Sequence, residues 1–225
     1  MSANSQASRK SEAIDQQVKQ EYRPNPLETI DAFRSRKLLE LETEIDEYRA
    51  WVDRGMGVFL RSRGGPRVQK IFERLTPAIN EQIEDVNQGK HEFTNPTIVQ
   101  MAGLSDEEFI YLLDLASERV ERRNFEDASA MFEVLSLLHP ASHLVWMGMG
   151  CAESGLQRFQ RAREAFEIAL LQSEKKPPLV YVYAIQNEIR AGDKERAQEL
   201  LAEGLAKCAE QNAAGIEKQL RALSF

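Results

Sequence analysis

The sequence predicts an all-α protein: a solenoid of three helix-turn-helix repeats closed by a C-terminal capping helix and preceded by further N-terminal helices. Three observations support this prediction. Glycine and proline are few, 12 and 8 among 225 residues, whereas Ala, Leu, Glu and Arg are abundant and favour helix. Apolar residues recur every three or four positions in several stretches. The second half of the chain also repeats itself at a nearly constant spacing.

The chain is expected to divide into three parts. Residues 1–24 are polar and lack apolar periodicity, so a disordered tail is expected there. An N-terminal helical region is expected over residues 25–103, with Asn25 as the N-cap and Pro26 at the first helical position. The repeat domain is expected over residues 104–225.

Within the N-terminal region, one apolar seam has heptad-like spacing: Leu38, Leu41, Ile45, Tyr48 and Val52. The seam is too short for an independent coiled coil, so we expect it to pack on the main domain or on a second copy of itself. The segment from Arg61 to Arg67 contains Gly64-Gly65-Pro66 and ends this helix. A further amphipathic stretch follows, and Thr76-Pro77 is expected to restart its helix.

The repeat domain begins with a clear helix-start signal. Ser105 and Glu108 have the spacing of a capping box, and Leu104 can pack on Phe109 as a hydrophobic staple, so a helix is expected from Asp106. At the other end, Ile216, Leu220 and Leu223 are spaced for a helix that seals the last repeat.

The repeat has a period of about 34 residues. Ala128 recurs as Ala162 and Phe132 as Phe166, each 34 residues on, and Ala197 and Leu201 follow 35 residues later. This is the length of a tetratricopeptide unit. Small residues such as Ala162 let the two helices of one unit approach, and large residues fill the space between units. One such unit cannot bury its apolar face alone, so three are expected to stack.

Three glycines near the middle of the chain require an interpretation. Gly148, Gly150 and Gly155 could suggest a phosphate-binding loop, but a dinucleotide fingerprint needs three closely spaced glycines after a strand. Here the spacing differs and the first two glycines lie inside a helical repeat. Gly148 and Gly150 are therefore predicted to be packing residues, and Gly155 is predicted to end a helix with positive φ.

The first helix of each repeat is expected to line the concave side of the solenoid, through repeat positions 2, 5, 9 and 12. Eight of the twelve residues there are Leu, Ile, Val or Met, and none is charged, which predicts a surface that binds an extended peptide or a helix. Alternatively, the N-terminal helices fold back and fill the groove. The predicted peptide-binding residues are Ile110, Leu113, Ser117, Val120, Leu144, Met147, Cys151, Ser154, Leu179, Val182, Gln186 and Ile189.

Several segments resemble one known family. Residues 109–140, beginning FIYLLDLASERV, resemble the first repeat of type III secretion class II chaperones, which bind translocator proteins. The run Met147-Gly148-Met149-Gly150-Cys151 is similar to that family's Leu-Gly-Leu-Gly-Ala stretch, and residues 175–201 resemble its third repeat. The resemblance covers residues 104–210. Val180 to Asn187 departs from the family pattern because it lacks the usual His and Cys, and the N-terminal region is longer than the family's.

The resemblance implies a cytoplasmic bacterial chaperone without catalytic activity. Its partner would be a secreted translocator protein bound through a segment in the concave groove, and its N-terminal helices could form a homodimer. The alternative is a tetratricopeptide scaffold or regulatory protein of a secretion or signalling assembly, with the N-terminal helices docking a different partner.

Other functions are not favoured by the sequence. The net charge is −7, of which residues 105–225 contribute −6 (20 acidic and 14 basic), so nucleic acid is not expected as a partner. Direct membrane insertion is not expected either, because no apolar stretch approaches about 18 residues. His139 and His143 have metal-like spacing but lack an evident third ligand, and Cys151 lacks an activating histidine, so no metal, cofactor or catalytic residue is expected.

One basic cluster is not explained by the repeats. Arg61, Arg63, Arg67 and Lys70 surround the glycine-proline turn. They form either an exposed loop or a contact for an acidic partner or a nucleic acid.

Overall fold

The computed structural model describes residues 43, 46, 49–87, 103–172 and 177–223. Within these residues all regular secondary structure is helical, and no strand is present. The all-α prediction is therefore confirmed. The expected tail over residues 1–24, the N-cap Asn25 and the first four seam residues, Leu38 to Tyr48, lie outside the described residues.

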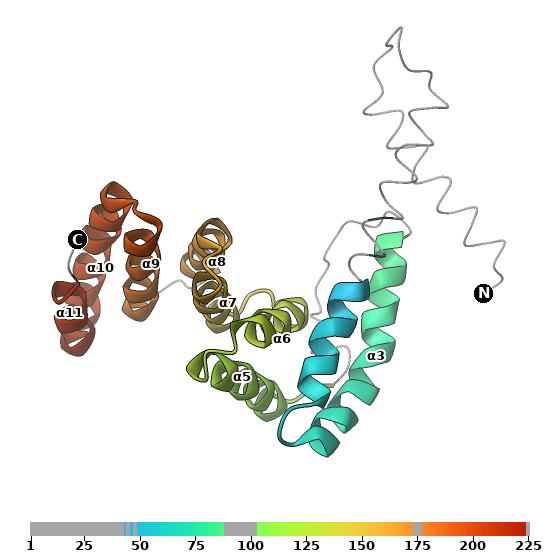
Figure 1. The fold of residues 1–225 in the computed structure, drawn as a ribbon. Helices are drawn as coiled ribbons and strands as arrows, with labels where there is room; N and C mark the ends of the chain where they lie inside the picture. The colour runs from blue at the N-terminus through green and yellow to red at the C-terminus, as the bar shows by residue number, and fades with distance from the viewer. Residues whose placement is uncertain (1–42, 44–45, 47–48, 88–102, 173–176, 224–225) are drawn as a thin grey trace, which may run out of the picture.

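Three antiparallel helix pairs follow one another along the chain, and a final helix covers the last pair (Figure 1). Their bounds are α5 (Asp106–Glu121) with α6 (Phe125–Leu138), α7 (His143–Gly155) with α8 (Phe159–Gln172), α9 (Pro178–Ala191) with α10 (Lys194–Gln211), and α11 (Ala214–Arg221). The first helices of successive pairs also touch, α5 with α7 and α7 with α9. The tetratricopeptide-like solenoid predicted from the 34-residue period is the observed architecture.

The predicted start of α5 is confirmed. The backbone N–H of Glu108 donates to Ser105 Oγ over 3.2 Å, and the N–H of Ser105 donates to Glu108 Oε2 over 3.1 Å. These two bonds satisfy donors that a helix start otherwise leaves without a partner. Leu104 and Phe109 are both buried in the same core cluster. At the other end, Leu220 of α11 is fully buried, so α11 seals the last pair as expected.

The turn inside each helix pair contains one residue with left-handed backbone, at the same repeat position. These residues are Arg123 (φ 59°), Gln157 (φ 62°) and Gly192 (φ 84°). The prediction that Gly155 has positive φ was wrong, because the left-handed residue of the middle repeat lies two positions later, at Gln157. Gly155 is the last residue of α7 and has a packing role, described below.

A further helix pair precedes α5. The helix over residues 49–60 ends in the turn over residues 61–64, and α3 (Gly65–Asn87) follows. Gly64 has φ +91°, which only glycine adopts readily. The expected restart at Thr76-Pro77 was wrong: α3 continues through Pro77. The hydroxyl of Thr76 donates to the carbonyl of Phe72 over 2.7 Å, one turn back along the same helix.

This N-terminal pair packs on the first repeat. Gly55 lies against the backbone of Ala130 and the side chain of Val134 in α6, so closely that a methyl group at Gly55 would overlap both. Seven apolar residues of the pair share a core with α5, α6 and α7: Val52, Val58, Phe59, Val68, Ile71, Phe72 and Leu75. A second core cluster contains residues of α8, α9, α10 and α11. Trp146 of α7 packs against both clusters.

Candidate binding groove

The first helices of the three repeats line a pocket of about 280 Å³. They contribute Ser117, Val120 and Glu121 from α5, Met147, Gly148, Cys151, Ser154 and Gly155 from α7, and Tyr183, Gln186 and Arg190 from α9. Three phenylalanines from the second helices complete the lining: Phe125, Phe132 and Phe166. The pocket is therefore built from all three repeats.

Each of the three glycines of α7 lies under one phenylalanine ring. A side chain at Gly148 would overlap the ring of Phe132, one at Gly150 would overlap Phe166, and one at Gly155 would overlap Phe125. The predicted packing role of Gly148 and Gly150 is confirmed. Phe132 and Phe125, whose rings lie against Gly148 and Gly155, both line the pocket, although Phe132 is only 1% exposed.

Six of the twelve predicted groove residues meet at this pocket: Ser117, Val120, Met147, Cys151, Ser154 and Gln186. Ile110 and Leu144 occupy the same position of successive repeats, at the opposite ends of their helices from the pocket, and are 54% and 42% exposed. Leu179 and Ile189 are half-buried. Leu113 and Val182 are buried in the two core clusters, where their side chains hold the repeats together. A peptide-binding role for any of the twelve stays a prediction.

Sequence reasoning missed several lining residues although the repeat contained a signal for them. Gly148 and Tyr183 occupy equivalent positions 35 residues apart. Glu121, Gly155 and Arg190 occupy another equivalent position, 34 and then 35 residues apart. Both positions are one residue beyond positions used in the prediction. The pocket-lining face of the first helices is therefore wider than repeat positions 2, 5, 9 and 12, and it includes the charged side chains of Glu121 and Arg190.

The described N-terminal helices do not line the pocket. Among the residues that the structure describes, all lining residues lie between Ser117 and Arg190, while residues 49–87 pack on the first repeat. The basic cluster takes part in this packing. Arg63 forms an ion pair with Glu118 over 2.9 Å, and Arg67 forms one with Glu107 over 3.1 Å while lying over the ring of Tyr111.

Cys151, His139 and His143 are the potentially reactive side chains that the sequence singled out, and each has a distinct environment. Burial raises the pKa of the half-buried Cys151 thiol to about 12, so this thiol stays protonated at neutral pH. His139 ends α6 and lies against the ring of Phe109, whereas His143 begins α7. In the described part of the chain, no group of three or more His, Cys, Asp or Glu residues is placed to hold a metal ion.

None of the helices within the described residues is both long enough and apolar enough to cross a bilayer.

No protein-family model matches the chain. Two solved structures have a similar fold. A chain of the CopN–Scc3 complex aligns with a TM-score of 0.51 at 14% identity, covering 60% of this chain and 79% of that chain. The type III secretion translocator chaperone SycD of Yersinia enterocolitica aligns with a TM-score of 0.51 at 18% identity, covering 58% of this chain and 100% of that chain. The chain thus shares its fold with a known translocator chaperone.

Proposed function

We propose that this protein is a type III secretion chaperone that holds a translocator-type secreted protein in the cytoplasm by binding one of its segments in the groove. The observation that carries the proposal is the pocket lined by α5, α7 and α9, with Phe125, Phe132 and Phe166 among its lining residues. The fold shared with SycD and the resemblance of residues 104–210 to class II chaperones support the same function.

The pocket chemistry fits an extended polypeptide with apolar side chains. The half-buried side chains of Val120, Phe125 and Met147 provide apolar surface. Ser117 and Gln186 provide groups that can hydrogen-bond a peptide backbone. A pocket of about 280 Å³ accommodates a few side chains rather than a folded domain. The remainder of the client would then extend along the stack towards Ile110 and Leu144, the exposed apolar residues.

The proposal is tested by titrating the purified full chain with a translocator-type protein encoded near its gene. Met147→Glu places a charge among apolar lining groups, and we expect it to weaken binding by about tenfold or more. Gln186→Arg is a second pocket variant at an exposed position. Leu171→Glu is the matched control, because Leu171 is 79% exposed on α8 and does not line the pocket.

If the two pocket variants bind as tightly as the control while all three retain the same thermal unfolding, groove binding is excluded. Circular dichroism checks that each variant folds. The alternative of a scaffold that docks partners through its N-terminal helices has less support, since Arg63 and Arg67 pair with residues of α5. A homodimer through these helices stays a prediction that sedimentation equilibrium can test.

A further inference from the structure

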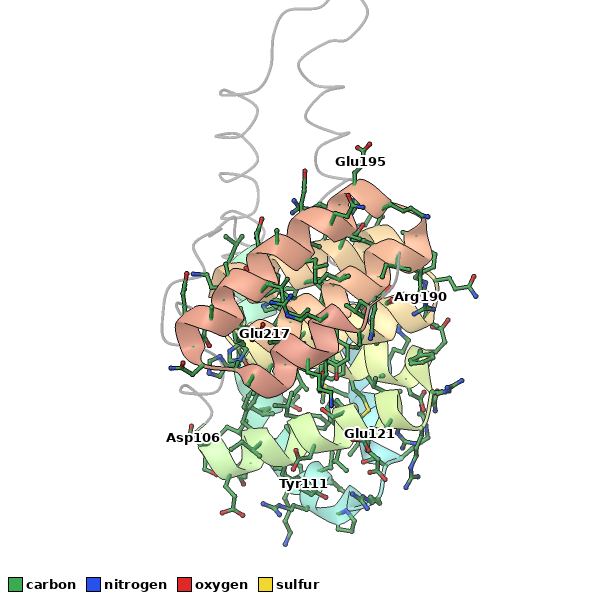
Figure 2. The ribbon with its side chains drawn as sticks, turned by 90° about the vertical axis from the view of Figure 1, so that its left-hand side faces the viewer. Asp106, Tyr111, Glu121, Arg190, Glu195 and Glu217 are labelled. Atoms are coloured by element: carbon green, nitrogen blue, oxygen red, sulfur yellow. The ribbon has the colours of Figure 1, made fainter. Side chains whose placement is uncertain are left out.

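One edge of the pocket is charged in a regular way. Glu121, Gly155 and Arg190 occupy the same position in three successive repeats, and all three line the pocket. The edge is therefore acidic at the first repeat, neutral at the second and basic at the third. Figure 2, which looks along the stack from its C-terminal end, shows Glu121 and Arg190 on the same side of the molecule.

The Arg190 side chain is held in place at this edge. Its Nη1 donates to Ser154 Oγ over 3.0 Å, and its guanidinium carbon lies 5.5 Å from the centre of the Phe159 ring. The equivalent contact one repeat earlier joins Gly155 to the ring of Phe125. A phenylalanine thus lies beneath this repeat position in two cases: Phe125 beneath Gly155, and Phe159 beneath the guanidinium of Arg190.

Arg190 keeps most of its hydrogen-bonding capacity. A guanidinium has five N–H donors, and the bond to Ser154 uses one of them. Within residues 103–172 and 177–223, no carboxylate forms an ion pair with Arg190, and Glu121 likewise has no ion-pair partner there. Both groups are exposed, so water solvates them in the free protein.

A segment that covers the pocket would remove part of this water. Charges at the edge of a newly buried apolar contact favour a partner of opposite sign and disfavour one of the same sign. A carboxylate suits Arg190 in particular, because the planar guanidinium can bind both carboxylate oxygens. A Lys or Arg side chain suits the carboxylate of Glu121 in the same way.

We propose that Arg190 and Glu121 select and orient the bound segment: its apolar residues cover the half-buried lining of Val120, Phe125 and Met147, an acidic residue meets Arg190, and a basic residue on the other side meets Glu121. This inference rests on the proposed groove function and adds the charge pattern and the direction of the client segment. It assigns Arg190 and Glu121 as specificity-determining residues.

The test is a selection of random 12-residue peptides, displayed on phage, against the immobilised full chain. For the wild type we expect apolar residues flanked by an acidic residue on one side and a basic residue on the other. With Arg190→Glu the acidic preference should become basic, and with Arg190→Gln it should disappear. Lys194→Glu changes the net charge as Arg190→Glu does but lies outside the pocket, and it should leave the selected pattern unchanged.

Selected peptides are then synthesised in their original and charge-reversed forms and titrated by fluorescence anisotropy. The wild type should prefer the original form by about tenfold, and the Glu121→Arg, Arg190→Glu double variant should prefer the reversed form. An apolar consensus with no charge preference, or the same consensus for wild type and Arg190→Glu, overturns this inference and leaves the groove function in place. If the wild type enriches no peptide at all, both proposals fail.

Discussion

Close contacts between glycine and phenylalanine determine how tightly the middle repeat packs. Phe132 and Phe166 are almost completely buried, and each ring occupies the space that a side chain on α7 would need. Because interiors pack at the density of organic crystals, neighbouring residues have little room to adjust. The glycine run of α7 is thus a consequence of ring packing.

Gly148→Ala tests this packing. The added methyl group would overlap the tip of the Phe132 ring, and we expect the free energy of unfolding to fall by about 1–2 kcal/mol despite the better helix propensity of alanine. Urea unfolding measures the change. Gly215→Ala is the control: nothing lies within 4 Å of the new methyl group there, so stability should stay the same or rise. A stabilised Gly148→Ala variant would contradict this account.

A buried carboxylate links three structural units. Glu133 of α6 has a side chain that is 5% exposed, and it pairs with Arg54 of the N-terminal pair and Arg161 of α8, each over 3.3 Å. Desolvation by burial is the largest influence and raises the pKa of Glu133, and the two arginines and a hydrogen bond from Trp51 oppose it without cancelling it. The folded state therefore holds a proton on Glu133 more tightly than the unfolded chain does.

The sign of the pH dependence follows from this shift. The contribution of Glu133 to the free energy of unfolding is fully present below the ordinary carboxyl pKa of 4.5 and is lost as the pH rises through the raised pKa of the folded state. We expect the free energy of unfolding of the wild type, minus that of Glu133→Gln, to fall as the pH rises from 4.5 to 7.5. Urea unfolding across this range measures it, and a difference that grows with pH would refute the assignment.

At the scale of helices, the N-terminal pair is attached to the first repeat by one close crossing and a set of ion pairs. The crossing is at Gly55, where the helix over residues 49–60 meets the backbone of α6. Three ion pairs join α3 and the preceding turn to α5: Arg63 with Glu118, Arg67 with Glu107, and Arg74 with Glu108 over 2.5 Å. The three arginine side chains are 47–75% exposed, whereas Glu108 and Glu118 are half-buried. Ion pairs with an exposed partner contribute little energy each, so the apolar crossing is expected to dominate.

Gly55→Ala is expected to lower the free energy of unfolding by about 1–3 kcal/mol, since its methyl group would push two helix backbones apart. Gly57→Ala provides the control on the same helix, because only the flexible end of Arg61 lies near the new methyl group. Urea unfolding of both variants decides the question. Equal stabilities for the two variants would show that the crossing at Gly55 is not tightly packed.

Local signals were sufficient to predict the start of α5 and the end of the helix over residues 49–60. The capping box at Ser105 and the glycine-proline turn after Arg61 each involve neighbouring residues, so their structure depends little on the rest of the fold. The errors arose where tertiary packing decides. Gly155 looked like a helix end with positive φ, yet the ring of Phe125 accounts for it. Pro77 looked like a helix start, yet α3 continues through it.

The period of 34 residues was enough to predict the solenoid and six of the fourteen residues that line the pocket. It could not decide how far each helix face extends, and the pocket lining also includes Tyr183 and Arg190. The 34-residue period could not predict how the N-terminal pair packs on the first repeat either, because residues 49–87 have no counterpart in the repeat. The division of the chain at residue 104 stays a prediction.

For the whole molecule, the central claim is that stacked helix pairs form an apolar pocket in which a secreted partner inserts one segment. The most direct measurement is photo-cross-linking with p-benzoylphenylalanine at position 147, inside the pocket, and at position 171, on the exposed face of α8. The account predicts that a translocator partner is cross-linked from position 147 and not from position 171. Equal cross-linking from both positions, or cross-linking from position 171 alone, would contradict it.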